Sequence, residues 1–350
     1  MTGTGHLVVG PAEHGVVRFA EQVVGALNPG EPPVRTTWRQ LREDPAAVLA
    51  PLGGGSLVHT QYTDRLFGPR CEESADLFTI VRQVLARKGC RLSVTLHDLP
   101  PGPGELTAGE EPLQTRRASA YRRVAGSCAG VIVSSEHERT RLSTVLTTAG
   151  PPVVVIPLPI DRVHSGPVQA RPVRDVTVLG FLYPGKGHRE VLQAMVKLPA
   201  DISMTALGRP SEGHEDLVPE LRRQAGAAGR TLRVTGFVPD HALTPALHAA
   251  GIPVAPYCQV SASGSIATWL GAGRRPLVPD IAYTREVEHR CPGALWRYDP
   301  RGEDGSLTSL PEALADAVAH PERTWLGATT VGPDSAHVMA RYADALRGWS

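Results

Sequence analysis

Residues 176–195 read VTVLGFLYPGKGHREVLQAM and place a strand, a glycine-rich turn and a helix in direct succession. The turn brings free backbone N–H groups, a helix N-terminus and the side chain of Lys186 to one point, which suits a bound phosphate. The spacing is neither G-x-G-x-x-G nor G-x-x-x-x-G-K-[ST], which argues against dinucleotide and P-loop sites. Because glycine turns follow parallel strands in many α/β proteins, the segment alone does not establish phosphate binding.

The composition is that of an ordinary globular protein. A chain of 350 residues exceeds the usual size of a single core, so we expect two domains. Hydrophobic residues make up 41% and charged residues 20%, and the formal net charge of +1 provides no field that would attract nucleic acid. The abundance of glycine, proline and arginine is typical of GC-rich bacterial genomes, so we expect an actinobacterial source.

Cysteine usage and the N-terminus indicate a cytoplasmic protein. The five cysteines are scattered, odd in number and never spaced C-x-x-C, which argues against a disulfide framework and a zinc site. The N-terminus lacks a basic segment followed by a signal-like apolar stretch. No run approaches the roughly 18 apolar residues that would span a bilayer.

Short apolar runs alternate with helical patterns along the whole chain. In the first half these runs are HLVVG, SLVHT, RLSVTLHD, GVIVSS and VVVIPLP, which predicts parallel βαβ units in a doubly wound sheet. The pattern stops at 157–172, a proline-rich stretch typical of a linker, and restarts with DVTVLGFL for a second doubly wound domain. We therefore expect an α/β fold with Rossmann-like domains at 1–165 and 166–333, facing each other across a cleft, and a closing helix at 334–350. Ligands of such sheets bind outside the carboxyl ends of the strands.

In the first half, three strand ends carry residues that suit a ligand. Gly15 stands before a helix and lets a ligand approach the backbone, and His97 directly follows a buried strand. Each has a simpler explanation, which is a tight turn at Gly15 and a structural histidine at 97. Between them, four polar residues gather at the strand end at 59–65: His59, Thr63, Asp64 and Arg65. They suit a hydroxyl-rich or charged ligand. Alternatively, they cap the following helix and form an ion pair without any ligand.

In the second half, two further loops precede helices. The loop GFVPD at 236–240 follows a strand, and its backbone groups suit a nucleobase edge, although Asp240 also suits a helix N-cap without a ligand. The segment from Ser261 to Ser265 offers small side chains and free N–H groups, which indicates a second anion site or a serine-rich cap. Paired carboxylates, His-x-x-His spacings and a Ser–His–Asp arrangement are not visible, so hydrolysis by two carboxylates or by a metal is not favoured.

Six segments together resemble a known family in their order and spacing: HGVVRFA (14–20), HTQYTDRLFG (59–68), VTLHD (94–98), GFLYPGKG (180–187), GFVPD (236–240) and GRRPLVPD (273–280). They are similar to the group-1, family-four-like retaining glycosyltransferases with the GT-B fold. The resemblance covers nearly the whole chain. It implies transfer of a sugar from a nucleoside diphosphate sugar to an acceptor hydroxyl, with retained anomeric configuration and without a required metal or other cofactor.

The resemblance also implies roles for individual residues. His97 matches the histidine next to the transferred sugar, and Lys186 matches the lysine that neutralises the diphosphate. A fixed cation there makes physical sense, because the leaving group gains charge in the transition state. The strand end at 59–65 would face the acceptor. The donor would be bound by the glycine turns, the base loop and the second helix start: Gly15, Val16, Gly180, Lys186, Val238, Ser263, Gly264, Ser265, Ile266 and Thr268.

Two departures from the family pattern bear on the donor. Family members usually have an arginine five residues before the lysine, where this chain has Phe181. They also have two glutamates spaced eight apart, where this chain has Val260 and Thr268. The diphosphate loses a partner unless Arg274 or Arg275 reaches it, and an unusual donor sugar would fit the loss of the glutamates.

Three functions remain open at this point. The first is an active glycosyltransferase on a small acceptor, either a natural product or a cell-envelope precursor. The second is a pseudo-glycosyltransferase that binds a sugar nucleotide or couples an activated cyclitol to an amine. The third is a phosphorylase or epimerase, for which the sequence offers neither a pyridoxal-phosphate lysine context nor paired carboxylates.

Membrane contact has little support. Four arginines lie on one predicted helix and can meet anionic head groups: Arg116, Arg117, Arg122 and Arg123. Such a run is usually a solvated face, and nothing else in the sequence indicates a membrane.

Overall fold

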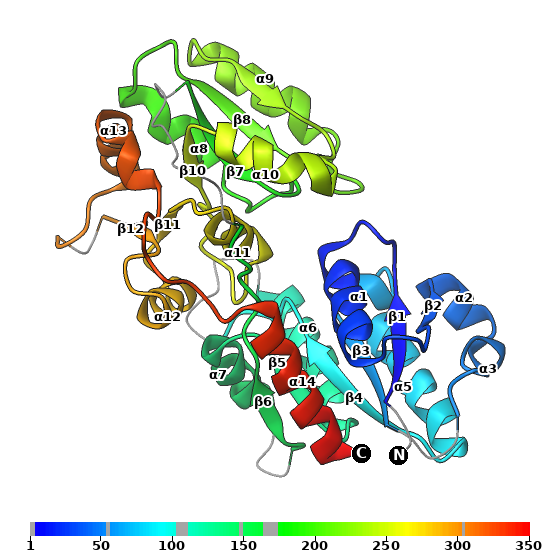
Figure 1. Ribbon diagram of the computed structural model, residues 1–350. Helices are drawn as coiled ribbons and strands as arrows, with labels where there is room; N and C mark the ends of the chain where they lie inside the picture. The colour runs from blue at the N-terminus through cyan, green and yellow to red at the C-terminus, as the bar shows by residue number, and fades with distance from the viewer. Residues whose placement is uncertain (1–3, 54–56, 103–110, 147–149, 164–173, 303–304) are drawn as a thin grey trace. The chain divides into compact units, whose positions relative to one another are not determined.

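The computed structural model describes residues 4–53, 57–102, 111–146, 150–163, 174–302 and 305–350. The chain divides into two compact units (Figure 1). Unit 1 comprises Met1–Leu158 and Ser335–Ser350, and unit 2 comprises Pro159–Asp334. The domain boundary predicted at 165/166 falls among residues 164–173, which lie outside the described part of the chain.

Unit 1 contains a six-stranded parallel sheet in the order β2-β1-β3-β4-β5-β6. Each strand except β2 corresponds to an apolar run of the sequence. The strands are β1 (Gly5–Val9), β2 (Val34–Thr36), β3 (Leu57–Tyr62), β4 (Arg91–Leu96), β5 (Val131–Val133) and β6 (Val153–Val155). The helices are α1 (Gly15–Leu27), α2 (Trp38–Glu43), α3 (Pro45–Val48), α4 (Asp64–Phe67), α5 (Cys71–Arg87), α6 (Glu111–Gly126), α7 (Glu136–Val145) and α14 (Ser335–Trp349).

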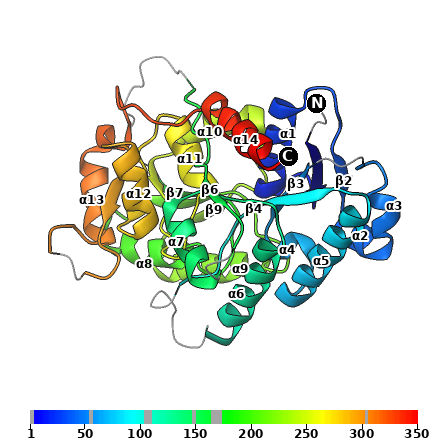
Figure 2. The ribbon, with the colours of Figure 1, turned by 90° about the horizontal axis from the view of Figure 1, so that it is seen from below.

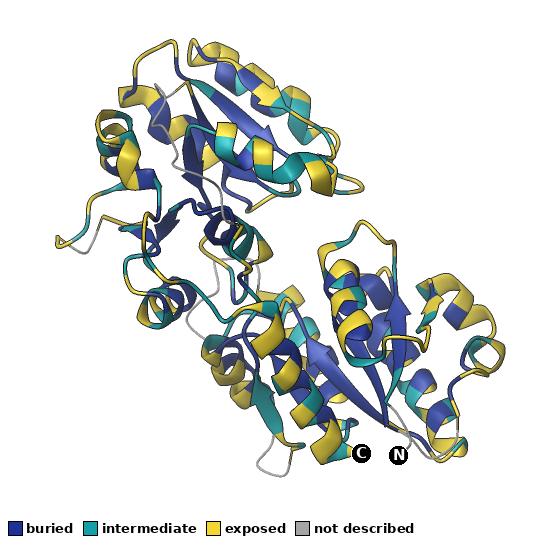
Figure 3. Cartoon of the chain, in the orientation of Figure 1, coloured by how far each residue is buried: buried dark blue, intermediate teal, exposed yellow. Residues whose placement is uncertain are grey.

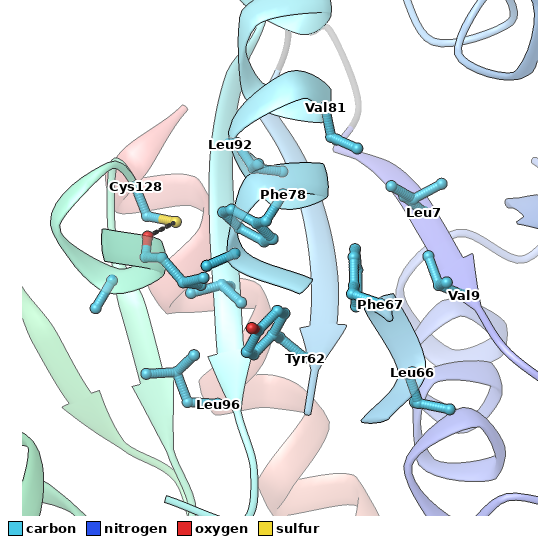
Figure 4. Packing of buried hydrophobic residues seen from close by; sticks show 14 of the residues in the cluster. Leu7, Val9, Tyr62, Leu66, Phe67, Phe78, Val81, Leu92, Leu96 and Cys128 are labelled. Carbon is cyan, nitrogen blue, oxygen red and sulfur yellow. Dashed lines mark hydrogen bonds between the residues drawn. The ribbon is translucent and has the colours of Figure 1, made fainter. Parts of the chain in front are cut away.

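One face of this sheet packs against α5 and α6 through an aromatic cluster (Figure 4). The ring of Tyr62 meets those of Phe78 and Tyr121 edge to face, with centroids 5.4 Å apart in both pairs. The hydroxyl group of Tyr62 lies 2.8 Å from that of Ser74, so its polar end also has a partner inside the core.

The last helix of the chain, α14, belongs to unit 1 and lies beside α1 (Figure 2). Its buried residues Val338, Met339 and Tyr342 pack in one cluster with Phe19 of α1 and Ile132 of β5. The final helix therefore completes the core of the unit that begins the chain.

Unit 2 contains a second six-stranded parallel sheet, in the order β12-β11-β10-β7-β8-β9. Most residues of its strands are buried, whereas its helices expose their outer faces (Figure 3). The strands are β7 (Asp175–Leu179), β8 (Ser203–Leu207), β9 (Leu232–Val234), β10 (Ile252–Val254), β11 (Leu277–Pro279) and β12 (Trp296–Tyr298). The helices are α8 (His188–Ala194), α9 (Leu217–Ala227), α10 (Asp240–Ala249), α11 (Gly264–Gly271), α12 (Ala282–Arg290) and α13 (Leu310–Ala319), with 3-10 turns η1 (Met195–Lys197) and η2 (Pro321–Thr324).

The predicted α/β class with two doubly wound sheets is confirmed. The sequence analysis missed β2 and β12, because an arginine in the middle of each short strand, Arg35 or Arg297, leaves no apolar run to stand out. The N-cap of α10 is Pro239 rather than Asp240, which is the first helical residue. No described helix combines the length and apolar character needed to cross a membrane.

Candidate functional site

Each sheet has one place where the chain reverses its direction of strand addition, and polar residues collect at both places. In unit 1 the reversal lies between β1 and β3, and in unit 2 between β7 and β10. At such a switch point the loops leaving two neighbouring strands diverge to opposite faces of the sheet and leave room for a ligand. The loop that leaves β1 ends at Gly15, the first residue of α1, and the loop that leaves β3 contains Thr63. The loops that leave β7 and β10 contain Lys186 and Ser263.

In unit 2 the loop after β7 is folded tightly against the loop after β8. Gly180 has a φ of +112°, and its carbonyl oxygen lies so close to Gly208 that a Cβ there would be 2.1 Å away. The backbone N–H of Leu182 donates to the carbonyl of Arg209 at 2.9 Å. These two glycines therefore allow a close approach of backbones that side chains would prevent.

Lys186 points back into this loop instead of into solvent. Only 5% of Lys186 is exposed, and its Nζ lies 3.2 Å from the hydroxyl of Ser265 on α11. The same nitrogen stands 4.0 Å from the centre of the Tyr257 ring, a cation–π contact that holds the charge in place. A Cβ on Gly180 would lie 3.3 Å from this nitrogen. The cation predicted from the sequence is thus buried and positioned by contacts from both halves of the sheet.

The N-terminus of α11 stands beside this lysine. Ser263 is its N-cap, and its hydroxyl accepts a hydrogen bond from the N–H of Ile266 and a second contact from the hydroxyl of Tyr257. Gly264 is exposed, with nothing within 4 Å of the position that a Cβ would occupy. The first turn of α11 therefore presents backbone to an open space next to Lys186.

Two other predicted donor residues, and the phenylalanine at 181, occupy different surroundings. Val238 is half-buried in an apolar cluster with Trp269. The hydroxyl of Thr268 donates to the carbonyl of Gly264 at 2.7 Å, inside its own helix. The side chain at 181 is partly exposed and lies 5.7 Å from the guanidinium of Arg209.

Arg209 and Tyr257 were missed by the sequence analysis. The guanidinium of Arg209 lies over the rings of Phe181 and Phe237, at 5.7 and 6.0 Å from their centres. Both residues follow strand ends, in ALGRP and in PVAPY, and that position was the available signal.

Arg274 and Arg275 do not reach the loop of Lys186. Arg274 is 1% exposed, and its guanidinium donates to the carbonyls of Leu247, Ala250 and Gly251, which close the end of α10. It also stacks on the ring of Trp325 at 4.1 Å. Arg275 donates to the carbonyl of Leu295 at 3.2 Å. Neither arginine therefore replaces the missing partner beside Lys186, because both follow the C-terminal end of α11, opposite to the end beside that lysine.

In unit 1 the turn after β1 is open. Gly15 is exposed and has nothing within 4 Å of the position of a Cβ, and Val16 beside it is half-buried. His14 is the N-cap of α1, and its Nδ1 accepts from the N–H of Val16 at 3.2 Å. Burial lowers the pKa of His14, with opposing effects from the charges of Asp98 and Arg65.

The polar residues after β3 form a connected group with α6. Asp64 is paired with Arg117 at 2.8 Å, and Arg117 also donates to the carbonyl of Asp98 at 2.8 Å. The hydroxyl of Thr63 donates to the carboxylate of Asp98 at 3.2 Å. Arg65 is exposed and forms no ion pair within the described residues. The ion pair expected between Arg65 and a glutamate of the following helix is therefore absent from this part of the chain.

His97 lies where β4 ends, next to this group. It is 8% exposed, and its Nε2 lies 2.7 Å from the amide oxygen of Gln61. Burial lowers its pKa to about 4, with Asp98 raising it and His14 lowering it further. The imidazole is consequently neutral near pH 7 and can exchange hydrogen bonds with a ligand without carrying charge.

His59 does not accompany the other predicted residues. It lies in the middle of β3, which continues to Tyr62, and only 1% of it is exposed. Its two ring nitrogens lie 2.9 Å from the hydroxyl of Ser93 and 3.1 Å from that of Thr95. A histidine with both nitrogens bonded inside the core cannot contact an acceptor, so we remove His59 from the candidate site.

Comparison with known proteins identifies the fold. No family model matches the sequence, and no curated protein matches it either. Among solved structures, HepE of Anabaena in complex with UDP and glucose superposes with a TM-score of 0.73 at 15% identity, over 99% of this chain and 100% of that one. Sucrose-phosphate synthase from Thermosynechococcus elongatus superposes with a TM-score of 0.71 at 15% identity, over 99% and 95% of the two chains. The chain has the GT-B fold.

Similarity also extends to larger proteins of the GT-B fold. The pneumococcal O-GlcNAc transferase GtfA, solved with UDP and GlcNAc, superposes with a TM-score of 0.56 at 13% identity, and the match covers 87% of this chain and 59% of that one.

Within the described part of this chain, no cluster of three or more His, Cys, Asp or Glu side chains is arranged to hold a metal ion.

Proposed function

We propose that this chain is a retaining glycosyltransferase of the cytoplasm that moves a sugar from a nucleoside diphosphate sugar to a hydroxyl of a small acceptor. The acceptor class is a natural product or a cell-envelope precursor. One observation carries the proposal. Lys186, the hydroxyl of Ser265 and the open first turn of α11 meet at the switch point between β7 and β10. A buried cation beside a helix N-terminus suits a diphosphate.

The proposed chemistry needs little from the protein beyond placement and charge. The acceptor oxygen bonds to the anomeric carbon of the donor while the bond from that carbon to the diphosphate oxygen breaks. The leaving diphosphate gains negative charge and takes the proton of the acceptor hydroxyl on the same face, which retains the anomeric configuration. Lys186 stabilises the charge that develops, and this stabilisation is larger in the transition state than in the bound donor.

We assign the remaining residues by chemistry and position. We assign the backbone at Gly15 and Val16 to binding of the donor phosphates, and His97 to a hydrogen bond with a hydroxyl of the transferred sugar. The polar group at the end of β3 is given to the acceptor, because it offers both donors and acceptors of hydrogen bonds: Thr63, Asp64 and Arg65. HepE was solved with UDP-glucose, so uridine nucleotides are the first donors to try.

A second function is favoured by the residues that replace the family's charged groups. The partly exposed ring of Phe181 and the internally bonded Thr268 offer neither a cation nor a carboxylate to a donor. A protein that binds a sugar nucleotide without transferring its sugar would tolerate both changes, and so would one that couples it to an amine. Release of the nucleotide only in the presence of an amine would favour this second function over the first.

The experiment is a ligand screen with UDP-, GDP-, ADP- and dTDP-sugars in the presence of EDTA, read by thermal unfolding. At 100 times its Kd, a ligand stabilises the native state by about 2.7 kcal/mol, which raises the Tm by roughly 5 °C or more for a unit of this size. We expect one nucleotide class to do so, and sugar release to follow on adding alcohol acceptors. Absence of a shift with every nucleotide would refute the donor site. A shift without transfer to any alcohol would select the second function.

A further inference from the structure

A chain of buried hydrogen bonds runs from His97 to the last helix of the protein. The Nε2 of His97 lies 2.7 Å from the Oε1 of Gln61, and the Nε2 of Gln61 lies 3.4 Å from the Nε2 of His59. That nitrogen of His59 is also 3.1 Å from the hydroxyl of Thr95. The hydroxyl of Thr95 is in turn 3.1 Å from that of Tyr342 on α14. All five residues are buried.

The direction of these hydrogen bonds can be traced from the carbonyl of Val58, which can only accept. The hydroxyl of Ser93 can donate to the carbonyl of Val58 at 3.4 Å, and its oxygen then accepts from the Nδ1 of His59 at 2.9 Å. His59 then carries its hydrogen on Nδ1, and its Nε2 is an acceptor. The amide nitrogen of Gln61 can donate to that nitrogen, which turns the amide oxygen of Gln61 toward His97.

This orientation determines which nitrogen of His97 carries the hydrogen. An amide oxygen accepts only, so the Nε2 of His97 must be protonated and its Nδ1 must hold the lone pair. Nδ1 has no hydrogen-bond partner among the residues that the structure describes. The neutral ring is supported by burial, which lowers the pKa of His97 to about 4. One acceptor nitrogen is therefore left for a ligand at the end of β4.

We propose that Gln61 is a positioning residue that holds His97 in the Nε2–H form, so that Nδ1 accepts a hydrogen bond from a hydroxyl of the bound sugar. The identity of that hydroxyl as one of a sugar rests on the proposed function, whereas the tautomer does not. A ligand group that only accepts, such as a carboxylate or phosphate oxygen, finds no donor on this ring. Gln61 thereby selects a hydroxyl-bearing ligand at His97.

The tautomer can be measured without substrate. In protein labelled with 15N-histidine, two-bond proton–nitrogen correlations at pH 7.5 distinguish a protonated Nε2 from a protonated Nδ1, and a His97→Gln variant identifies the signals. We expect the Nε2–H form in the wild type and a mixture of forms in Gln61→Met, which keeps the side-chain length but removes the acceptor oxygen. Thr95→Val is the matched control, because it removes a hydroxyl from the same chain of hydrogen bonds while Gln61 keeps its contacts with His97 and His59.

The wild-type spectrum decides the matter even where Gln61→Met does not fold, since an Nδ1–H form of His97 would overturn the assignment. With a donor and acceptor from the ligand screen, Gln61→Met should lower kcat about tenfold, the factor for one ordinary hydrogen bond. The KM for the nucleotide sugar should stay within about twofold. An unchanged kcat beside mixed tautomers would also overturn it. A wild type that transfers no sugar would refute the proposed function and leave the tautomer to be judged by its spectrum.

Discussion

The ammonium nitrogen of Lys186 lies 3.2 Å from the hydroxyl of Ser265. Lys186 follows β7 and Ser265 follows β10, the two strands on either side of the reversal in the unit 2 sheet. Lys186 and Ser265 lie far apart in the sequence. Parallel strand addition brings their loops together because β7 and β10 are neighbours in the sheet. The charge of Lys186 is thus held by the topology itself.

Replacing Lys186 by alanine should abolish sugar transfer while the protein still folds. Loss of one preorganised group that stabilises developing charge costs about 100-fold or more in kcat. The measurement is nucleotide release with saturating donor and acceptor, beside a circular dichroism spectrum of the variant. Lys197→Ala is the control, because this exposed lysine lies in η1 away from the loop. Normal turnover in Lys186→Ala would remove this residue from the reaction.

Two glycines of the same loop provide a matched pair. Gly180 and Gly185 both have positive φ, at +112° and +88°, so alanine should strain the backbone in both by about 1 kcal/mol. Only at Gly180 would the new methyl group crowd the site, at 3.1 Å from the hydroxyl of Ser265 and 3.3 Å from Lys186. Calorimetric titration should show at least tenfold weaker nucleotide binding in Gly180→Ala and a change within twofold in Gly185→Ala. Equal losses in the two variants would argue against a ligand beside Lys186.

Arg274 should matter for stability and not for the ligand. Arg274→Met leaves the carbonyls of Leu247, Ala250 and Gly251 without their donor, which should lower the free energy of unfolding by about 3 kcal/mol. Urea denaturation measures this loss. The control Arg189→Met removes an exposed ion pair and should change stability by about 0.5 kcal/mol or less.

Nucleotide affinity of Arg274→Met, measured well below its Tm, should equal that of the wild type. A large loss of affinity with little loss of stability would restore Arg274 as a phosphate ligand.

Stability should fall as the pH drops below about 6.5. Burial lowers the pKa of His97 to about 4, and burial together with the charge of Lys186 lowers the pKa of His188 to about 3. Between these values and 6.5 the unfolded chain binds protons that the folded chain does not, so acid favours unfolding. Each such histidine contributes a slope of about 1.4 kcal/mol per pH unit. Urea midpoints at pH 7, 6 and 5 should decline less in His188→Gln than in the wild type. The exposed control His241→Gln should follow the wild type, and a pH-independent midpoint would contradict the low pKa values.

Much of the fold could be predicted because each buried parallel strand is a short apolar run between helical patterns. The position of Lys186 could be predicted for the same reason, since the loop after an apolar strand must emerge at the carboxyl edge of the sheet. His59 could not be placed correctly. The polar stretch HTQYT looks like the end of a strand, but β3 continues through it under the cover of Tyr342. No local signal reveals a partner that lies at the other end of the chain, and Gln61 was overlooked for the same reason.

The return of α14 to unit 1 sets the order in which a newly made chain can mature. Unit 2 occupies one uninterrupted stretch, so it has all its residues once the ribosome has passed Asp334. Unit 1 is begun first but waits for Tyr342 and its neighbours, and until then Phe19 and Ile132 lack their covering helix. The unit that emerges first is therefore the last to be completed, and its uncovered face is the surface that a chaperone would meet during synthesis.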